Sequence, residues 1–204
     1  MNQFCTCHSH PASLDTGSTV EAMAAREVEL GSGTLTMTDH GTLAAARSVY
    51  DVARKNKLTP ILGLEAYVRD DNCPIIQAAG IEPIDGKLDH YLKYFHVTLH
   101  AKDQEAFETL VKVLSNADLN RAEQHGSERK ALFTWQDLET LGDKNVTVGS
   151  GCLIGMVQRH LLEGRPDLAE KYYERLRATF KQGNFYAELF PHVVNYIQVK
   201  LSSK

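Results

Sequence analysis

The sequence has no long apolar run. None of its 204 residues belongs to a stretch near the roughly 20 apolar residues that a membrane-spanning helix needs, so we expect no membrane association. The first ten residues, MNQFCTCHSH, lack a basic start followed by an apolar segment, which argues against a secretory signal. Cysteine is scarce, with 4 residues beside 9 histidines, and without an export signal such thiols are more often reduced or metal-bound than paired in disulfides. We therefore predict a cytoplasmic protein.

An excess of basic residues is also missing. The chain has 22 Lys and Arg against 26 Asp and Glu, for a formal charge of −4, which argues against a general basic coat for nucleic acid but permits a local basic groove. Its 43% hydrophobic and 24% charged residues are typical of a globular chain with a core. The length allows one large domain or two small ones, and we predict a single domain over residues 1–204.

Segments with strand-like and helix-like patterns alternate along the chain. We predict strands over residues 4–8, 34–41, 59–68, 94–101, 145–151 and 184–190. We predict helices over residues 18–31, 42–56, 103–119, 134–142, 153–164 and 166–180. Residues 69–92 and 120–130 are polar and irregular, so we expect loops there. This alternation is typical of β-α-β units, and it predicts an α/β fold with parallel strands.

Chemically active side chains fall at or near the ends of the predicted strands. They are His8, His10, Asp39, His40, Glu65 and Cys152, and His96 lies within the predicted strand over residues 94–101. Taken one at a time, a buried histidine or cysteine is more often structural than a ligand, and Asp39-His40-Gly41 could be only a turn. Taken together at strand ends, which form the active-site face of parallel β/α folds, they predict a metal centre. Imidazole and thiolate favour zinc or manganese, and a carboxylate can bridge two ions.

The H-x-H pair near the start of the chain has a preferred geometry. Side chains alternate along an extended strand, so His8 and His10 point to the same face and can reach one ion together. By the same alternation Cys5 and Cys7 point to the other face. A zinc site that used all four side chains would therefore require this segment to be a loop.

Four stretches of the sequence carry a resemblance to a known family. They are CHSHPASLDTGST, LTMTDHGTLAAARSVYDVARKNKLTPILGLEAYV, FHVTLHAKDQEAFETLVKVLS and GSGCLIGMVQRHLLEGRPDLAEKYYERLRATFKQGNFYAEL. In this order they resemble the polymerase-and-histidinol-phosphatase (PHP) domain, in the version that begins the alpha subunit of bacterial DNA polymerase III. The resemblance implies a distorted TIM-like β/α barrel with two or three divalent ions per chain, zinc or manganese, with magnesium as a further candidate.

The resemblance also implies roles for individual residues. By motif, the metal ligands would be His8, His10, Asp15, His40, Glu65, His96 and Cys152. Glu65 would bridge two ions, and Asp39 would orient its neighbours. We predict these two as the catalytic residues. An alternative alignment places His8 second in the H-x-H pair with Thr6 first. We prefer His8 and His10 because that alignment keeps both imidazoles.

The sequence departs from the family at its end. The family completes its metal site with an Asp-x-His motif on a late strand, and no such motif follows residue 184 here, so we expect the last barrel strands to be missing as well. Three explanations are open. The chain could be a truncated or split product, His192 could substitute for the motif, or the activity could have been lost.

The resemblance implies metal-dependent phosphodiester hydrolysis, as a 3′–5′ exonuclease acting on DNA 3′ ends or another phosphate ester. Arg69 and Lys102 are candidates to contact the phosphate. One alternative is a catalytically silent domain that supports a polymerase or docks a proofreading subunit. Another is a small-molecule phosphatase of the same superfamily. DNA polymerase activity is expected only if the chain is joined to further domains.

Overall fold

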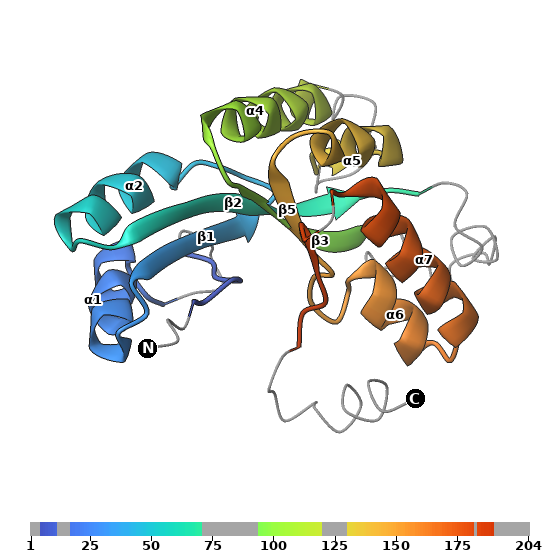
Figure 1. Ribbon diagram of the computed structural model, residues 1–204, viewed down its shortest axis with the longest axis horizontal. Coiled ribbons are helices and arrows are strands. Elements are labelled where there is room, and N and C mark those ends of the chain that lie inside the picture. Colours follow the sequence, from blue (N-terminus) through green and yellow to red (C-terminus); the bar gives the residue numbers. More distant parts are fainter. Residues whose placement is uncertain (1–4, 12–16, 71–93, 120–129, 182, 190–204) are drawn as a thin grey trace, which may run out of the picture.

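A six-stranded sheet forms the centre of the molecule, and helices cover it (Figure 1). The structure is a computed structural model that describes residues 5–11, 17–70, 94–119, 130–181 and 183–189. The strands are β1 (Thr34–His40), β2 (Thr59–Val68), β3 (Phe95–Ala101), β4 (Leu132–Phe133), β5 (Val146–Gly149) and β6 (Phe185–Tyr186). The sheet has the order β1-β2-β3-β5-β6, and the short β4 pairs with the end of β2. This arrangement confirms the predicted α/β class.

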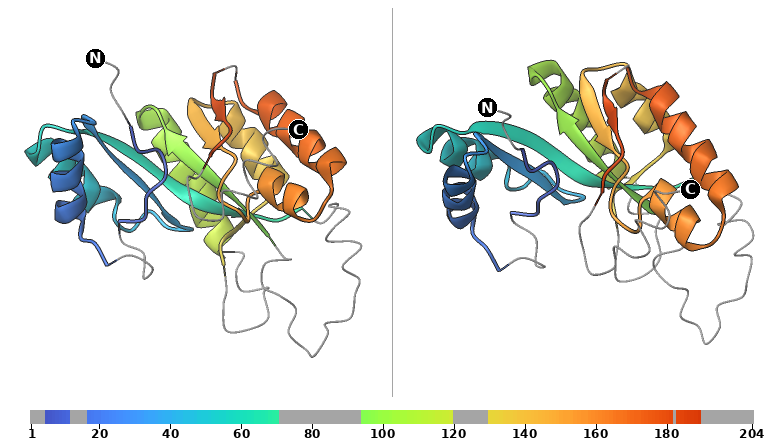
Figure 2. Two further views of the ribbon diagram at one scale, coloured as in Figure 1. Left: turned by 90° about the horizontal axis from the view of Figure 1, so that it is seen from below. Right: turned by 60° about the horizontal axis from the view of Figure 1, so that its bottom comes forward.

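Six helices lie within the ranges that the sequence predicts. They are α1 (Val20–Leu30), α2 (Ala46–Lys55), α4 (Gln104–Leu119), α5 (Trp135–Gly142), α6 (Met156–Leu162) and α7 (Pro166–Thr179). Capping residues set several of their ends: the Thr19 hydroxyl accepts a hydrogen bond from Ala22 N, and Thr134 forms a capping box with Asp137. Helices α6 and α7 pack side by side at one end of the sheet, away from α1 and α2 (Figure 2). Among the described helices, none combines the length and the apolar character that crossing a membrane requires.

The direction of β3 differs from the prediction. Strand β1 pairs with β2 in parallel, as do β4 with β2 and β6 with β5, whereas β3 is antiparallel to both of its neighbours, β2 and β5. Five described strands therefore run the same way and β3 runs against them. The prediction of parallel strands was wrong at β3 because adjacent parallel strands need a long crossover, usually a helix. The sequence between β2 and β3 has no helical pattern, so it did not require β3 to run parallel to β2.

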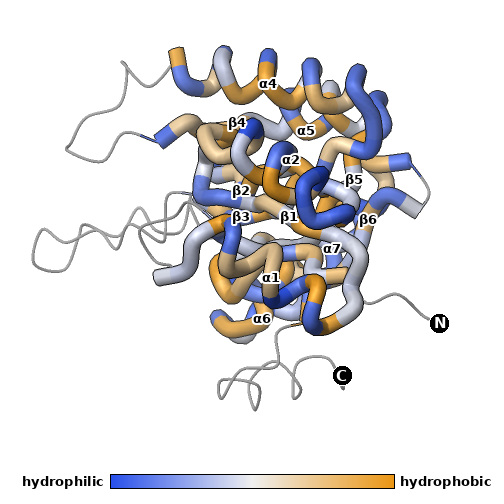
Figure 3. Tube along the Cα trace, turned by 90° about the vertical axis from the view of Figure 1, so that its left-hand side faces the viewer, coloured by the Kyte–Doolittle hydropathy of each residue, from blue (hydrophilic) through white to orange (hydrophobic). Residues whose placement is uncertain are grey.

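One face of the sheet packs against the helices. Alternate residues of β3 (Phe95, Val97 and Leu99) are buried in a core with the inner side of α4 and with α5 and α7. Figure 3 shows hydrophobic and hydrophilic residues recurring along α4, as expected for an amphipathic helix. Burying a side chain such as Leu110 contributes about 1.5–3 kcal/mol, so this face supplies much of the stability of the fold.

In the N-terminal segment a strand is predicted over residues 4–8, but its described part, residues 5–8, does not form a regular strand, and neither do residues 9 and 10. The segment nevertheless runs beside β1. Thr38 N donates to Ser9 O at 2.7 Å, Ser9 N donates to the Thr38 hydroxyl at 2.9 Å, and the Ser9 hydroxyl donates to Thr36 O at 2.6 Å. Hydroxyl groups replace part of a strand ladder here, and the segment is held over the other face of the sheet.

Candidate metal centre

The reversal of β3 gathers the predicted site residues at one end of the sheet. His40 and Glu65 are register partners at the carboxyl ends of β1 and β2. Because β3 is antiparallel to β2, its first residues return to the same end, where His96 is the register partner of Tyr67. Cys152 follows the carboxyl end of β5. The structure therefore brings these residues together, and His96 reaches the cluster from the start of its strand.

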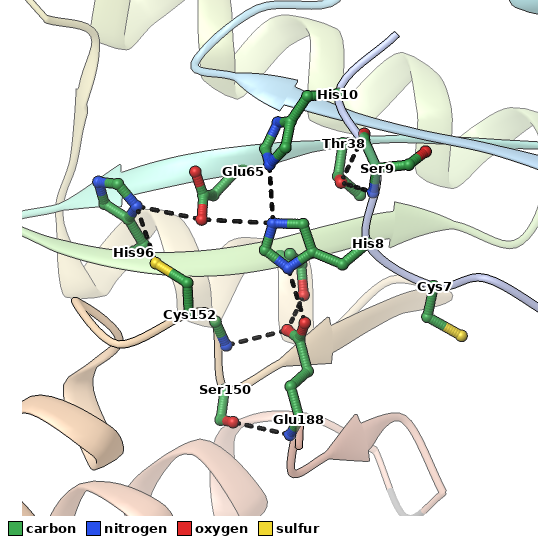
Figure 4. Close-up of polar contacts among 12 residues, drawn as sticks. Cys7, His8, Ser9, His10, Thr38, Glu65, His96, Ser150, Cys152 and Glu188 are labelled. Atoms are coloured by element: carbon green, nitrogen blue, oxygen red, sulfur yellow. Dashed lines mark hydrogen bonds and ion pairs between the residues drawn. The ribbon is translucent and has the colours of Figure 1, made fainter. Parts of the chain in front are cut away.

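The imidazoles of His8, His40 and His96 surround the buried carboxylate of Glu65, and Figure 4 shows His8 and His96 beside it. His40 Nδ1 lies 2.5 Å from Oε2, while His96 Nδ1 lies 3.1 Å and His8 Nε2 3.5 Å from Oε1. Burial raises the pKa of Glu65, but the hydrogen bonds from His40 and His96 and the charges of His96 and His8 outweigh burial and hold the pKa far below its usual range. Glu65 is therefore an ionised carboxylate shared by histidines from three segments.

His8 and His10 face the same side, although the segment that carries them is not a regular strand. Their Nε2 atoms lie 3.0 Å apart, and the ring of His10 stacks on that of His40 with a centroid distance of 4.1 Å. Two nitrogens that each lie about 2.1 Å from one ion are about 3.0–3.4 Å apart, so the pair has the spacing of a chelate. Cys7 points away from this cluster (Figure 4). Its thiol lies 4.0 Å from that of Cys5, as expected for the opposite face.

Cys152 borders the cluster on the side of His96. Its Sγ lies 3.5 Å from His96 Nδ1. Burial, and then the charge of Glu65, raise the pKa of Cys152 to about 12, so this thiol stays protonated unless a cation offsets the carboxylate. A bound divalent ion would favour the thiolate, which is the form that coordinates metals.

The residues present fit a divalent metal. Ligand atoms of two sets lie within 4.8 Å of one another, His8 with His10 and Glu65, and His40 with Glu65 and His96. Glu65 belongs to both sets. In addition, His96 Nε2 is buried without a hydrogen-bond partner. Imidazole and carboxylate groups in this number suit zinc or manganese.

Other predicted residues fall outside the cluster. Asp39 is fully buried, but it alternates with His40 along β1 and so lies on the face that carries Met37. Lys102 follows the opposite end of β3, and its amine donates to Asn184 Oδ1 at 3.0 Å, so the structure does not place it beside the histidines as a phosphate contact. Arg69 follows β2 at the end that carries Glu65. Asp15 and His192 lie outside the described residues.

The sequence reasoning missed Glu188, which follows β6. Its Oε2 accepts a hydrogen bond from His8 Nδ1 at 2.7 Å. Burial raises the pKa of Glu188, but the bond and charge of His8, with further bonds, outweigh burial and lower the pKa. The available signal was the same one that picked out Glu65, an acidic residue inside an apolar predicted strand. His100 is buried nearby, with its Nε2 2.6 Å from Cys7 O.

Comparison with known proteins gives the family. Residues 5–192 match the PHP domain, and the chain belongs to this family. The DNA polymerase III subunit alpha of Helicobacter pylori strain 26695 is 29% identical over 154 residues, which cover 76% of this chain and 11% of that protein. The subunits of Mycobacterium tuberculosis H37Rv (27% over 201 residues, 94% and 16%) and Thermus aquaticus (34% over 136 residues, 67% and 10%) are also similar.

The chain spans about a tenth to a sixth of the length of these relatives. Among solved structures, a candidate metal-dependent phosphoesterase from Bifidobacterium adolescentis aligns over 93% of this chain and 59% of that one, with 12% identity and a TM-score of 0.34.

Proposed function

We propose that this chain is a metal-dependent phosphoesterase of the DNA polymerase III alpha type, which hydrolyses phosphodiester bonds at DNA 3′ ends. The observation that carries the proposal is the shared position of Glu65. One buried carboxylate lies between two sets of imidazoles, and each set is compact enough to hold an ion. Such a shared carboxylate suits a centre of two or three ions, as phosphoester hydrolysis commonly uses.

The roles follow from the two sets. His8 and His10 would bind one ion with Glu65 Oε1, and His40 would bind a second with Oε2. His96 and Cys152 would complete the centre, with Asp15 as a further ligand from the N-terminal segment. The ions would supply a bound water of lowered pKa and neutralise the phosphate oxygens. The protein would hold the imidazoles in place and keep Glu65 ionised.

The similarity to DNA polymerase III alpha subunits supports DNA as the substrate. Because the chain spans only a small part of those subunits, polymerase activity and contact with other replication proteins would depend on further domains. The buried polar cluster also counts against a purely structural role. Burying several charged groups costs free energy, and a domain without metal would be at least as stable with apolar residues there.

The first test is metal content. Protein purified without chelator or a histidine tag should carry two or three zinc or manganese ions per chain by elemental analysis, and Glu65→Gln should carry fewer. The loaded protein should then shorten 5′-labelled single-stranded DNA from its 3′ end and hydrolyse a thymidine 5′-monophosphate aryl ester faster than a simple aryl phosphate. The reverse preference would indicate a small-molecule phosphatase. One ion or none, with no hydrolysis, would instead support a silent structural domain.

A further inference from the structure

The carboxylate of Glu188 is enclosed by hydrogen-bond donors. His8 Nδ1 lies 2.7 Å from Oε2, Gly151 N donates to Oε1 at 2.9 Å, and the Thr98 hydroxyl also donates to Oε1. The Glu188 side chain is only 11% exposed. Both carboxylate oxygens thus already accept hydrogen bonds from protein groups. Glu188 is therefore better suited to hold the ligand His8 in place than to bind an ion itself.

The backbone around Glu188 is held as well. Glu188 N donates to the Ser150 hydroxyl at 2.9 Å, and Gln158 Nε2 donates to the same hydroxyl at 2.6 Å and to Gly151 O at 3.0 Å. Gln158 is buried, so these bonds are shielded from water. The loop that leaves β5, and that continues to Cys152, therefore fixes both the main chain and the side chain of Glu188 (Figure 4).

The glycines of the Gly149-Ser150-Gly151 motif make room for this carboxylate. A Cβ on Gly149 would lie 2.1 Å from Glu188 Oε1 and 2.2 Å from the Thr98 hydroxyl, too close for any side chain. Gly151 has φ +80°, a conformation that favours glycine, and its N–H is one of the three donors. The motif is thus shaped around the Glu188 side chain.

A carboxylate at His8 Nδ1 decides which nitrogen of that imidazole carries the proton. The carboxylate accepts a hydrogen bond, so the proton lies on Nδ1 in the neutral ring. The lone pair is then on Nε2, the atom 3.0 Å from His10 Nε2 and 3.5 Å from Glu65 Oε1. Histidine ligands of metals commonly have such a carboxylate partner, which orients the ring and raises its basicity.

We propose that Glu188 is a positioning residue, which holds His8 as the Nδ1–H tautomer and thereby presents its Nε2 to a divalent ion. The inference rests on the proposed function for the identity of the ion site. Glu188 is not among the predicted ligands. Its hydrogen bonds connect the N-terminal segment, through His8, to the loop that carries Cys152.

The tautomer can be measured in metal-free protein. Nitrogen-15 NMR of labelled histidines, with His8 assigned by comparison with a His8→Gln variant, should show Nδ1–H for His8 in the wild type. Glu188→Gln should shift His8 toward Nε2–H, because the amide cannot accept from His8, Thr98 and Gly151 at once. The matched control is Glu29→Gln, an exposed residue of α1 that should leave the tautomer unchanged. A wild-type His8 with its proton on Nε2 would overturn the proposal without any variant.

Metal affinity provides the second readout. Titration with zinc or manganese should show an affinity about 10–100-fold lower for Glu188→Gln than for the wild type or Glu29→Gln. Gly149→Ala should cause a similar loss while leaving every ligand and Glu188 itself in the sequence. An unchanged affinity and tautomer in folded Glu188→Gln would contradict the proposal. If the wild type binds no metal, the proposed function fails, whereas the NMR result still decides whether Glu188 sets the tautomer.

Discussion

The two faces of the sheet are almost equally buried and chemically opposite. Along β3, Phe95, Val97 and Leu99 face the helices, while His96 and Thr98 face the metal centre, and none of the five is more than 6% exposed. Burial alone therefore does not distinguish core from site. The two faces differ in their contacts: the helix face packs apolar surface, whereas the site face pairs many of its polar groups with one another and leaves His96 Nε2 without a hydrogen-bond partner.

This difference implies that stability and metal binding can be separated by mutation. Polar groups buried without partners would cost free energy, and here histidines, carboxylates and hydroxyls serve as each other's partners. The helix face should therefore control folding, and the site face should control the ion. Four substitutions test this division, from the largest expected effect to the smallest.

Leu99→Ala should have the largest effect, on folding. The side chain is fully buried on the helix face, so its truncation leaves a cavity and should lower the free energy of unfolding by about 2–5 kcal/mol. Urea denaturation followed by circular dichroism measures the change. Leu189→Ala is the matched control, because Leu189 is 73% exposed and should lose little. An equal loss of unfolding free energy in Leu99→Ala and Leu189→Ala would show that the helix face does not control folding.

Glu65→Gln should act mainly on metal binding. Losing the carboxylate shared by both ligand sets should lower zinc or manganese affinity by about 100-fold or more, equivalent to about 2.7 kcal/mol. The fold should survive, because glutamine has nearly the volume of glutamate and its amide can still form hydrogen bonds with the neighbouring imidazoles. Isothermal titration and a thermal melt of the same sample check both parts. If Glu65→Gln lowered the melting temperature strongly but left the metal affinity of the folded protein unchanged, Glu65 would serve folding and not metal binding.

Arg175→Ala should lower the free energy of unfolding by a smaller amount. The Arg175 guanidinium stacks 3.6 Å from the centre of the Trp135 ring, and its Nη1 lies 3.4 Å from Asp70 Oδ2, but the side chain is 42% exposed. A partly solvated cation–π contact contributes about 0.5–1 kcal/mol, so the midpoint of urea denaturation should fall slightly with metal affinity unchanged. Arg175→Lys should recover part of the loss. A change in metal affinity would contradict the separation, because it would show that contacts among the helices also affect the metal site.

Asp103 provides the smallest effect and a pH test. The backbone N–H of Ala106 and then the Asn145 side chain lower the pKa of Asp103, which caps the start of α4. A lowered pKa in the folded state stabilises the protein above the unfolded pKa near 4, and this contribution is lost as the pH falls through the folded value. Asp103→Asn should melt slightly below the wild type at pH 6, with the difference closing toward pH 2. A difference that grows on acidification would contradict this assignment.

The parts of the fold with strong local signals were predictable. The helices predicted over residues 18–31 and 134–142 are present and begin after the caps Thr19 and Thr134, and the amphipathic pattern of residues 103–119 became α4. The direction of β3 was not predictable, because an apolar alternating segment reads the same from either end. The connection that could have decided it, residues 69–92, has no periodic pattern.

The candidate site was predictable for similar reasons. Imidazoles and carboxylates that interrupt apolar strands are expensive to bury, so they stood out in the sequence as His40, Glu65 and His96. Glu188 gave the same signal and was missed. What the sequence does not show is its set of partners, which come from segments about 40 to 180 residues away: His8, Thr98 and the loop after β5. Only proximity in the folded chain reveals that the Gly149-Ser150-Gly151 motif encloses its carboxylate.

The sequence by itself determined the α/β class, the helix boundaries to within a few residues, and the chemistry available for a metal site. Each of these depends on local periodicity, capping and residue type. The tertiary structure decided that β3 reverses, that Glu65 is shared by two sets of imidazoles, and that Glu188 meets His8. These features depend on contacts between segments distant in the chain, and such contacts follow from how the buried faces pack, which no local pattern records.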